Sequence, residues 1–278
     1  MIRRLCRSRL LVVGVLLSVL PLAFAIAAPL IAPHPPNEQT LSDRFLPPLS
    51  SGARGYHLLG TDALGRDLLS RIIYGAQISM LVGVTVVIIG GLLGTGVGIV
   101  AGYWGGAIDA LLMRIVDVFL AFPFLLIALV LMAMLGSGLS KVIIVLGLTS
   151  WVPYARVARA QVLGVKEREF VEASRAIGAG RGRIIARHIV PNVMSSVIVI
   201  ASFRVAAAIL SEATLSFLGV GVPPGTPSWG GILSEGRPYM LVSWGPTVFA
   251  GVMIMLTALS CNLIGDGVRD LLDPRWRK

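Results

Sequence analysis

The chain has 278 residues, of which 55% are hydrophobic and only 14% are charged, and its mean hydropathy is +0.84. This composition excludes an ordinary water-soluble domain and predicts a membrane protein that crosses the bilayer several times. A net charge of +10 would suggest nucleic-acid binding in a soluble chain. In a membrane chain, an excess of Lys and Arg instead marks the cytoplasmic side, so we expect no nucleic-acid partner.

Six segments with few or no charges predict an all-α integral membrane protein with six transmembrane helices, at residues 10–32, 78–101, 118–140, 142–155, 193–219 and 238–265. The first follows four arginines and is expected to remain as a membrane anchor, although a cleaved signal peptide also begins with basic residues. The fourth has only 14 residues and contains Pro153. Without it, the basic cluster between residues 156 and 187 would lie outside, against the usual bias.

Six spans place both termini in the cytoplasm, where 17 of the 24 Lys and Arg residues then lie. The loop at residues 33–77 is external in this topology. Within it Leu64, Leu68 and Ile72 recur at helical spacing, which predicts an amphipathic helix at the membrane surface after Asp62. This helix is either a simple interfacial lead into the second span or a functional element.

Four glycines in the second span lie four residues apart, at Gly90, Gly94, Gly98 and Gly102. On a helix they form one stripe without side chains, which lets another helix approach closely. Helix packing is the expected role, and a face left wide to line a transport path is the alternative.

Two charges, Arg204 and Glu212, fall inside the fifth span. Because a charge in the bilayer is costly, each is expected to face the bundle interior, a partner or a wet cavity. They are about 12 Å apart along a helix axis and therefore do not pair directly. A translocation-path role and a structural polar contact between helices both fit.

The internal loop at residues 156–191 is too long and too charged for a simple turn. The sequence predicts one short helix at 167–177, a break at Gly178, Gly180 and Gly182, and a second helix at 183–190 that is ended by Pro191. A helix, a glycine break and a helix on the cytoplasmic face suit docking into a groove on a partner. A solvated basic loop that only fixes topology is the alternative.

The sequence has no recognisable catalytic or metal-binding pattern. His34, His57 and His188 are far apart in the chain, and no G-x-S-x-G, H-E-x-x-H or C-x-x-C motif occurs. None of the three lysines follows a glycine, as a phosphate-binding loop requires. We therefore expect no enzymatic activity, no bound metal and no cofactor in this chain.

Residues 172–191 resemble the signature of binding-protein-dependent ABC importer permeases, which is Glu-Ala-Ala, three residues, Gly, nine residues, Ile, one residue and Leu-Pro. The positions are filled here by Glu172, Ala173, Ser174, Gly178, His188, Val190 and Pro191. Three of them depart from the signature, since Ser174 stands for Ala, His188 for Ile and Val190 for Leu. A His at this position is similar to the pattern of the peptide-permease branch.

Further stretches resemble the second, C-type permease subunit of dipeptide, oligopeptide and nickel importers. They are His57–Asp62 with Gly65–Asp67, Leu215–Gly219 with Thr226–Gly230, and Gly265–Asp270 with Asp273–Arg275. The resemblance implies a type I ABC importer permease fold. It divides the chain into an anchor helix and external loop (1–75), a permease domain (76–270) that contains the coupling loop (156–191), and a cytoplasmic tail (271–278).

The same resemblance implies a subunit of the bacterial inner membrane that forms half of a path for di- or oligopeptides. Its implied partners are a homologous permease, two ATPase subunits that hold ATP and magnesium, an external solute-binding protein and the lipid membrane. Nickel or another small solute is the alternative substrate. A stand-alone secondary transporter or channel is the alternative from another class, and it would leave the coupling loop unexplained.

Overall fold

The computed structural model describes residues 9–272, and most of them are helical. The helices are α2 (Arg9–Ile31), α3 (Leu68–Trp104), α4 (Gly106–Ala121), α5 (Phe124–Leu135), α6 (Leu139–Thr149), α7 (Val152–Val165), α8 (Glu169–Ala176), α9 (Arg181–Ile184), α10 (Val190–Phe217), α11 (Trp229–Gly236) and α12 (Gly245–Leu272). Single turns of 3-10 helix lie at Leu41–Asp43 and Arg237–Tyr239, and a π turn lies at Ile185–Ile189. Two short antiparallel strands, β1 (Ser50–Gly52) and β2 (Gly55–His57), form a hairpin in which Ser51 faces Tyr56.

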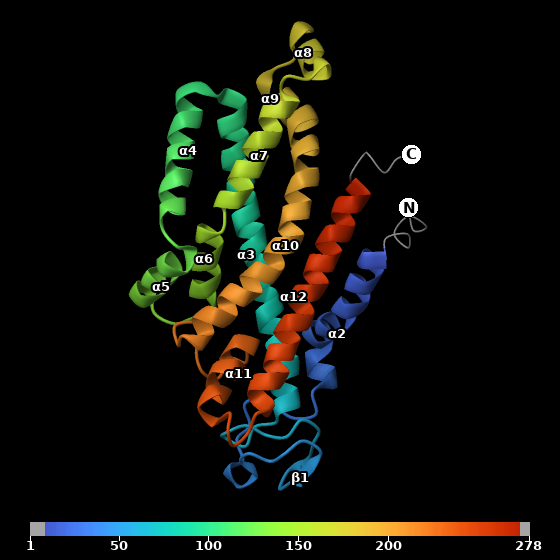
Figure 1. Ribbon diagram of the computed structural model, residues 1–278, viewed down its shortest axis with the longest axis vertical. Helices are drawn as coiled ribbons and strands as arrows, with labels where there is room; N and C mark the ends of the chain where they lie inside the picture. Colours follow the sequence, from blue (N-terminus) through green and yellow to red (C-terminus); the bar gives the residue numbers. More distant parts are fainter. Residues whose placement is uncertain (1–8, 273–278) are drawn as a thin grey trace.

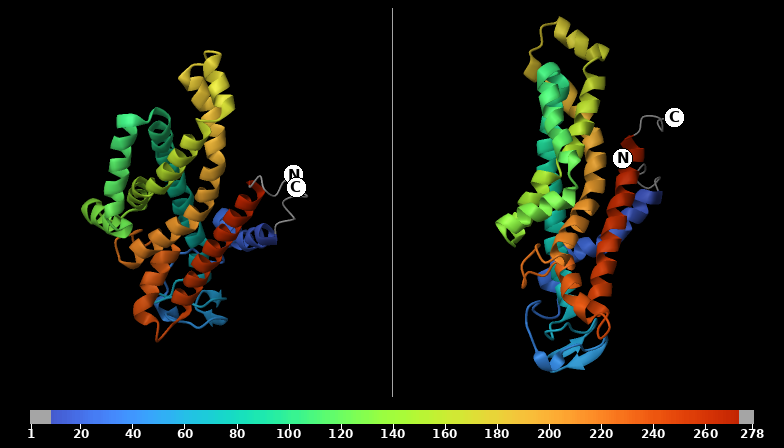
Figure 2. Two further views of the ribbon diagram at one scale, coloured as in Figure 1. Left: turned by 45° about the horizontal axis from the view of Figure 1, so that its top comes forward. Right: turned by 60° about the vertical axis from the view of Figure 1, so that its left-hand side comes forward.

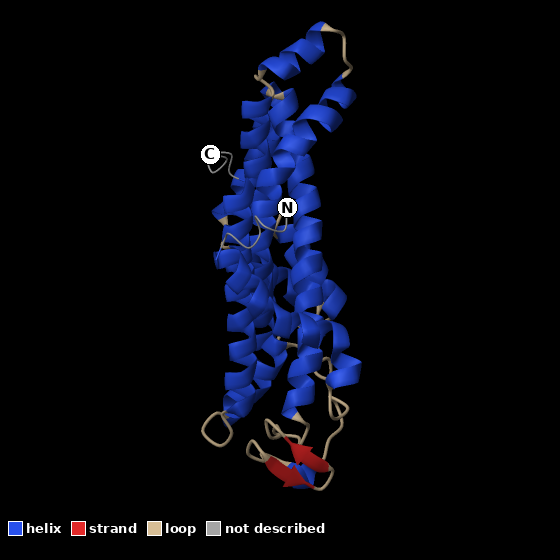
Figure 3. Cartoon of the chain, turned by 90° about the vertical axis from the view of Figure 1, so that its right-hand side faces the viewer, coloured by secondary structure: helices blue, strands red, loops and turns tan. Residues whose placement is uncertain are grey.

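The long helices lie along one axis, with α8 at one end of the molecule and the β1–β2 hairpin at the other (Figure 1, Figure 3). Two further views show α8 extending beyond the other helices (Figure 2). We call residues 32–67, which join α2 to α3 at the opposite end, the cap. Helices α3, α10, α11 and α12 share a buried apolar core next to the cap, which includes Leu68, Ile209, Trp229 and Ile254.

Five stretches of the described chain are long and apolar enough to cross a membrane: Leu10–Ile31, Leu68–Trp104, Leu139–Val165, Arg181–Phe217 and Gly245–Leu271. Helices α4 and α5 provide a sixth if they are counted together, although they are bent by 85°. The expected third span at 118–140 is therefore not one straight helix. Pro123 cannot donate a backbone hydrogen bond and drives the residue before it, Phe122, into an extended conformation.

The fourth span is longer than the sequence predicts, because α7 carries basic residues that were expected in a loop. Arg156 pairs with Asp117 of α4 at 3.0 Å, and the Arg159 guanidinium pairs with both carboxylate oxygens of Asp109 at 2.5 Å. These ion pairs let the helix continue past its uncharged stretch. The boundary predicted for the coupling loop is wrong at its start, since the chain leaves α7 only after Val165.

The prediction of an amphipathic surface helix after Asp62 is also wrong. Turns occupy that stretch, and α3 begins only after Asp67, whose carboxylate accepts a hydrogen bond from the Ser70 amide at 2.8 Å. The apolar positions Leu68 and Ile72 are fully buried against α11 and α12 rather than facing lipid. The predicted domain boundary at 75/76 therefore falls inside one continuous helix of 37 residues.

Pro191 does not end a helix, contrary to the prediction for this residue. The chain runs from α9 through the π turn directly into α10, and Pro191 occupies the first turn of α10. A proline ring clashes with the carbonyl group four residues earlier in a regular α-helix. The wider π turn just before Pro191 accommodates this ring, so the helix continues.

The last predicted span, 238–265, is displaced toward the C-terminus. Its first residues form a 3-10 turn and a loop, and α12 starts at Gly245. Before it lies α11, a short helix that the sequence analysis did not predict. Trp229 at the start of α11 is fully buried, and its indole N–H donates to the carbonyl oxygen of Ile72 on α3 at 3.0 Å.

Candidate functional site

The first part of the site is the coupling segment, residues 166–189, at the end of the molecule marked by α8. Helix α8 ends in a left-handed turn at Gly178, where φ is +80°. The Gly178 amide donates to the carbonyl oxygen of Arg175 at 2.9 Å, and the Ala179 amide donates to that of Ser174 at 3.0 Å. These two bonds are the Schellman arrangement that favours glycine at a helix end. A side chain added at Gly178 would meet open space.

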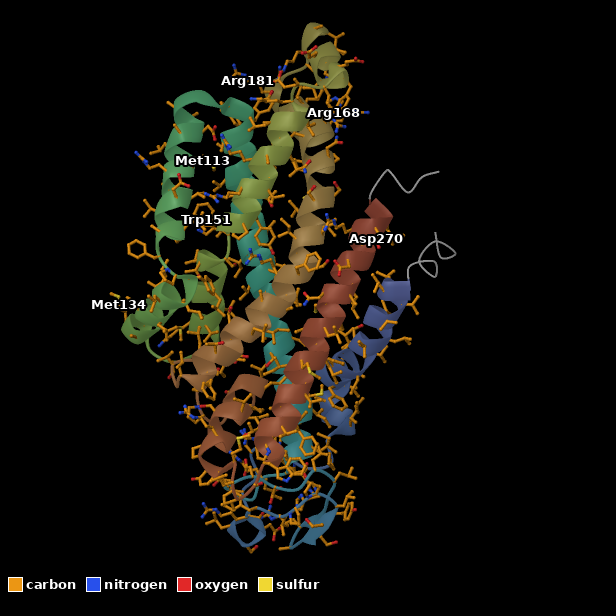
Figure 4. The ribbon with its side chains drawn as sticks, in the orientation of Figure 1. Met113, Met134, Trp151, Arg168, Arg181 and Asp270 are labelled. Atoms are coloured by element: carbon orange, nitrogen blue, oxygen red, sulfur yellow. The ribbon has the colours of Figure 1, made fainter. Side chains whose placement is uncertain are left out.

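The coupling segment is fixed on one face and free on the other. Val171 and Ile184 are buried in an apolar cluster with α7 and α10. Ile177, by contrast, is 85% exposed. Glu172 and Ala173 of the predicted signature are also exposed. The basic residues Arg168 and Arg181 lie at this same end (Figure 4).

Two of the three departures from the signature touch each other. The Ser174 hydroxyl lies 3.0 Å from Nε2 of His188, and the His188 ring also packs against Phe170 with ring centroids 5.7 Å apart. His188 sits on the π turn before Pro191, so this contact ties α8 to the start of α10.

The second part of the site is a cavity of about 380 Å³ near the middle of the bundle. Its walls come from α3 to α7 and from α10, and most of the lining side chains are apolar: Val86, Val87, Phe119, Leu120, Phe122, Phe124, Ile127, Leu146, Val152, Pro153, Ala207 and Ala208. The polar members are Thr149, Ser150, Tyr154, Arg204 and Ser211. The break between α4 and α5 contributes to this wall, so the bend at Pro123 helps to shape the cavity.

Arg204 is the charged residue of this lining. It is half-buried, and no carboxylate of the described residues forms an ion pair with it. The buried hydroxyl of Tyr154 also lacks a hydrogen-bond partner within residues 9–272. An unpaired guanidinium in a mostly apolar cavity can attract an anionic group of a solute.

Glu212, the other charge of the fifth span, does not line the cavity and is fully buried. Its Oε1 accepts hydrogen bonds from Ser216 at 2.8 Å and from Ser228 at 2.9 Å, and its Oε2 lies 3.4 Å from the Ser79 hydroxyl. The three serines come from α10, from the residue before α11, and from α3.

Each of these serine hydroxyls also accepts a hydrogen bond from a backbone amide. The Val222 amide donates to Ser216 at 3.2 Å, the Gly231 amide to Ser228 at 3.0 Å, and the Trp229 amide to Ser79 at 3.2 Å. Glu212 is therefore the common acceptor for three chains of hydrogen bonds that fix residues 218–231 against α3 and α10. The carboxylate makes a structural polar contact in this structure.

The glycine stripe of α3 faces α7 and the end of α6. A β-carbon at Gly94 would collide with the carbonyl oxygen of Trp151, and one at Gly98 with that of Ala155. The same addition at Gly102 would lie 2.8 Å from Cβ of Val162, and at Gly90 it would collide with the Ser150 hydroxyl. The stripe lets two helix backbones touch, as expected for packing, and it does not line the cavity.

Two of the three histidines, which are far apart in the chain, lie close together in the fold. His188 lies on the coupling segment, but the rings of His34 and His57 lie in the cap with centroids 5.0 Å apart. Together with Asp67 they form a group that could hold a metal ion. The sequence separation of 23 residues hides this pair because the β1–β2 hairpin folds back toward the end of α2.

Several site residues were not singled out from the sequence. Ser79 has no local signal, since it meets Glu212 across 133 positions of the chain. Ser216, Ser228 and Trp229 lie in the stretches that carry the family resemblance, so that resemblance could have linked them to Glu212. Asp62 and Arg66 also lie in these stretches. They form a buried network with Arg71, which reaches Glu235 of α11 at 2.7 Å.

The fold is shared with solved ABC importers. Two crystal forms of the inward-facing MetNI methionine ABC transporter contain a chain that superposes with a TM-score of 0.60 at 20% identity. In the first, the match covers 74% of this chain and 97% of that one. This degree of likeness shows the fold alone, and together with the apolar helices it defines an integral membrane protein with the type I ABC importer permease fold.

The chain belongs to the family described as binding-protein-dependent transport system inner membrane component, whose model matches residues 94–278. A second model, the N-terminal transmembrane domain of oligopeptide transport permease C, matches residues 1–48. The chain is therefore a membrane permease subunit of an ABC transporter in the bacterial inner membrane.

Relatives match over nearly the full chain. A putative peptide transport system permease protein of Brucella suis biovar 1 (strain 1330) is 45% identical over 99% of this chain and 91% of its own length. The dipeptide transport system permease protein of Bacillus subtilis (strain 168) is 40% identical over 99% and 85%. The glutathione transport system permease protein of Escherichia coli O6:K15:H31 is 42% identical over 98% and 89%.

Proposed function

We propose that this chain is the permease subunit of an ATP-driven importer of di- or oligopeptides and forms half of the translocation path. The observation that carries the substrate class is the unpaired Arg204 in a mostly apolar cavity. A peptide has a carboxylate that the guanidinium can attract. The mostly apolar walls can accept its side chains with little selectivity. The same guanidinium would repel a nickel ion. The relatives that are described as peptide, dipeptide and glutathione transport permeases support peptides as well.

The other half of the path is assigned to a homologous permease, because the resemblance to C-type permease subunits implies a heterodimer. Two ATPase subunits, which hold ATP and magnesium, are assigned to the exposed face of the coupling segment. An external solute-binding protein is assigned to the cap. Closure of the ATPases would draw the coupling segments together and tilt the helices as rigid bodies, which gives alternating access.

This assignment requires the cap outside and the coupling segment inside. Ser51 on β1 and Arg181 at the start of α9 are both exposed and suit single-cysteine labelling. In intact cells, a membrane-impermeant thiol reagent is expected to label a cysteine at Ser51 and not one at Arg181. The background is a chain in which Cys6 and Cys261 are replaced by Ser. Labelling at Arg181 with protection at Ser51 would reverse the orientation.

Coupling is tested by Gly178→Arg. A non-glycine residue strains the left-handed turn, and a long side chain there projects toward the docked ATPase. We expect normal membrane insertion and normal capture of the binding protein, but loss of substrate-stimulated ATP hydrolysis and of uptake. Reconstituted complexes with and without loaded binding protein provide the measurement. Gly105→Arg, at another left-handed turn that faces open space but lies outside the coupling segment, is the control.

Stimulated hydrolysis and uptake at the wild-type level in Gly178→Arg, with the ATPases bound, would assign the coupling segment to topology alone. Uptake by the isolated chain, without ATPase subunits, would instead favour a stand-alone transporter.

A further inference from the structure

Three metal-ligating side chains meet in the cap although they come from separate segments. His34 follows α2, His57 ends β2, and Asp67 precedes α3. One ligand atom of each lies within 4.8 Å of the other two. The two imidazole rings are tilted by 37° with centroids 5.0 Å apart.

His57 presents a free ring nitrogen in this group. Its Nδ1 lies 2.8 Å from Oδ1 of Asp67, and both side chains are almost completely buried. Its Nε2 is buried and has no hydrogen-bond partner in the described part of the chain. When the Asp67 carboxylate accepts a hydrogen bond from Nδ1–H, the proton of the neutral ring stays on Nδ1 and the lone pair is on Nε2, which can then bind a metal ion. A buried nitrogen acceptor without a hydrogen-bond partner is energetically unfavourable, and a bound metal ion would supply the missing partner.

We propose that His34, His57 and Asp67 form a binding site for a divalent transition-metal ion such as Zn²⁺ or Co²⁺. Imidazole nitrogen with carboxylate suits this class of ion better than Mg²⁺ or Ca²⁺, which prefer oxygen ligands. His57 binds through Nε2, His34 supplies the second imidazole, and Asp67 orients the His57 ring through its contact with Nδ1. His34 is half-buried, so the ion and its remaining water ligands reach the site from solvent.

The bound ion would act as a staple for the cap. It connects the segment after α2, the β1–β2 hairpin and the first turn of α3, whose other links are hydrogen bonds such as that from the His34 amide to the Ser70 hydroxyl at 3.0 Å. None of the three residues lines the cavity. The site is therefore independent of the proposed transport substrate and does not make nickel the cargo.

Metal binding is measured on the full-length chain, purified with an affinity tag that contains no histidine and with Cys6 and Cys261 replaced by Ser. Titration with Co²⁺ or with Zn²⁺ in competition with a chromophoric chelator gives the stoichiometry and affinity. We expect one ion per chain and an affinity at least tenfold weaker in His34→Gln. The control is His188→Gln, which removes the other histidine of the chain at the opposite end of the molecule and should leave metal binding unchanged.

Thermal unfolding provides a second readout, because an ion that binds only the folded chain raises the melting temperature. Zn²⁺ should raise it in the wild type and in His188→Gln, and not in His34→Gln. His57→Gln removes a buried group and could fail to insert, so the decision rests on His34→Gln. Equal affinity in the wild type and His34→Gln, or loss of binding in His188→Gln, would overturn the proposed site.

Discussion

Arg204 and Glu212 lie on the same helix, yet their surroundings are opposite. Arg204 lines a cavity and has no ion-pair partner among residues 9–272. Glu212 is fully buried and accepts hydrogen bonds from serines on three parts of the fold. A charge inside a span therefore has no single meaning. Its role depends on whether the chain supplies partners for it or leaves it open to a solute.

The comparison predicts that removing Glu212 has the largest effect on the folded chain. Glu212→Ala leaves three serine hydroxyls without their common acceptor. We expect a loss of stability on the order of 2–4 kcal/mol, from several polar contacts of about 1 kcal/mol or less each plus the cavity left behind. Thermal unfolding in detergent measures it.

Two variants make this result specific to the carboxylate. Glu212→Gln keeps one acceptor oxygen and should recover part of the stability. Thr214→Ala removes a hydroxyl that bonds only to its own helix, at Leu210, and should be nearly neutral. Wild-type stability of Glu212→Ala would mean that the serine network does not hold α11.

A smaller loss of stability is expected for Ser228→Ala. This change removes one of the three links to Glu212 and the cap of α11 at the Gly231 amide. A lost N-cap costs about 1 kcal/mol. Unfolding of Ser228→Ala should fall between the wild type and Glu212→Ala. Ser234→Ala, within the same helix, is the control, and a loss in Ser234→Ala equal to that in Ser228→Ala would contradict a special role for the cap.

The smallest change in stability is expected for Arg204→Ala. No ion pair of the described chain is broken, and removal of an unpaired charge from a membrane segment lowers its insertion cost. The free energy of unfolding should stay within about 1 kcal/mol of the wild type, and the complex yield should be unchanged. Ser202→Ala, two residues earlier on the same helix, is the matched control. A loss comparable to Glu212→Ala would show that Arg204 has a structural partner after all.

The sequence predicts best what neighbouring residues decide. The turn at Gly178 follows from a short helix and a residue without a β-carbon, and both lie within ten positions. The glycine spacing from Gly90 to Gly102 is likewise a property of one helix. The first anchor segment, predicted at 10–32, agrees with α2 at Arg9–Ile31.

Predictions failed where a distant segment decides the outcome. The apolar face after Asp67 suits a membrane surface equally well, and only α11 and α12 bury it in the protein. Pro191 stops a regular α-helix, but a π turn before it provides another solution. Ser79 and Glu212, or His34 and His57, gain their meaning only when the chain is folded.

The division of roles between the two charges is tested most directly by the uptake of two peptides. The reconstituted transporter is supplied with saturating binding protein, loaded with either a dipeptide that has a free carboxylate or the same dipeptide with a C-terminal amide. The ratio of the two uptake rates per assembled complex is compared between the wild type and Arg204→Ala, so that the preference of the binding protein cancels. We predict that the wild type favours the free carboxylate at least tenfold more strongly than Arg204→Ala does, while Glu212→Gln keeps the wild-type ratio at lower yield. An unchanged ratio in Arg204→Ala would contradict the proposal that Arg204 meets the substrate carboxylate in the cavity.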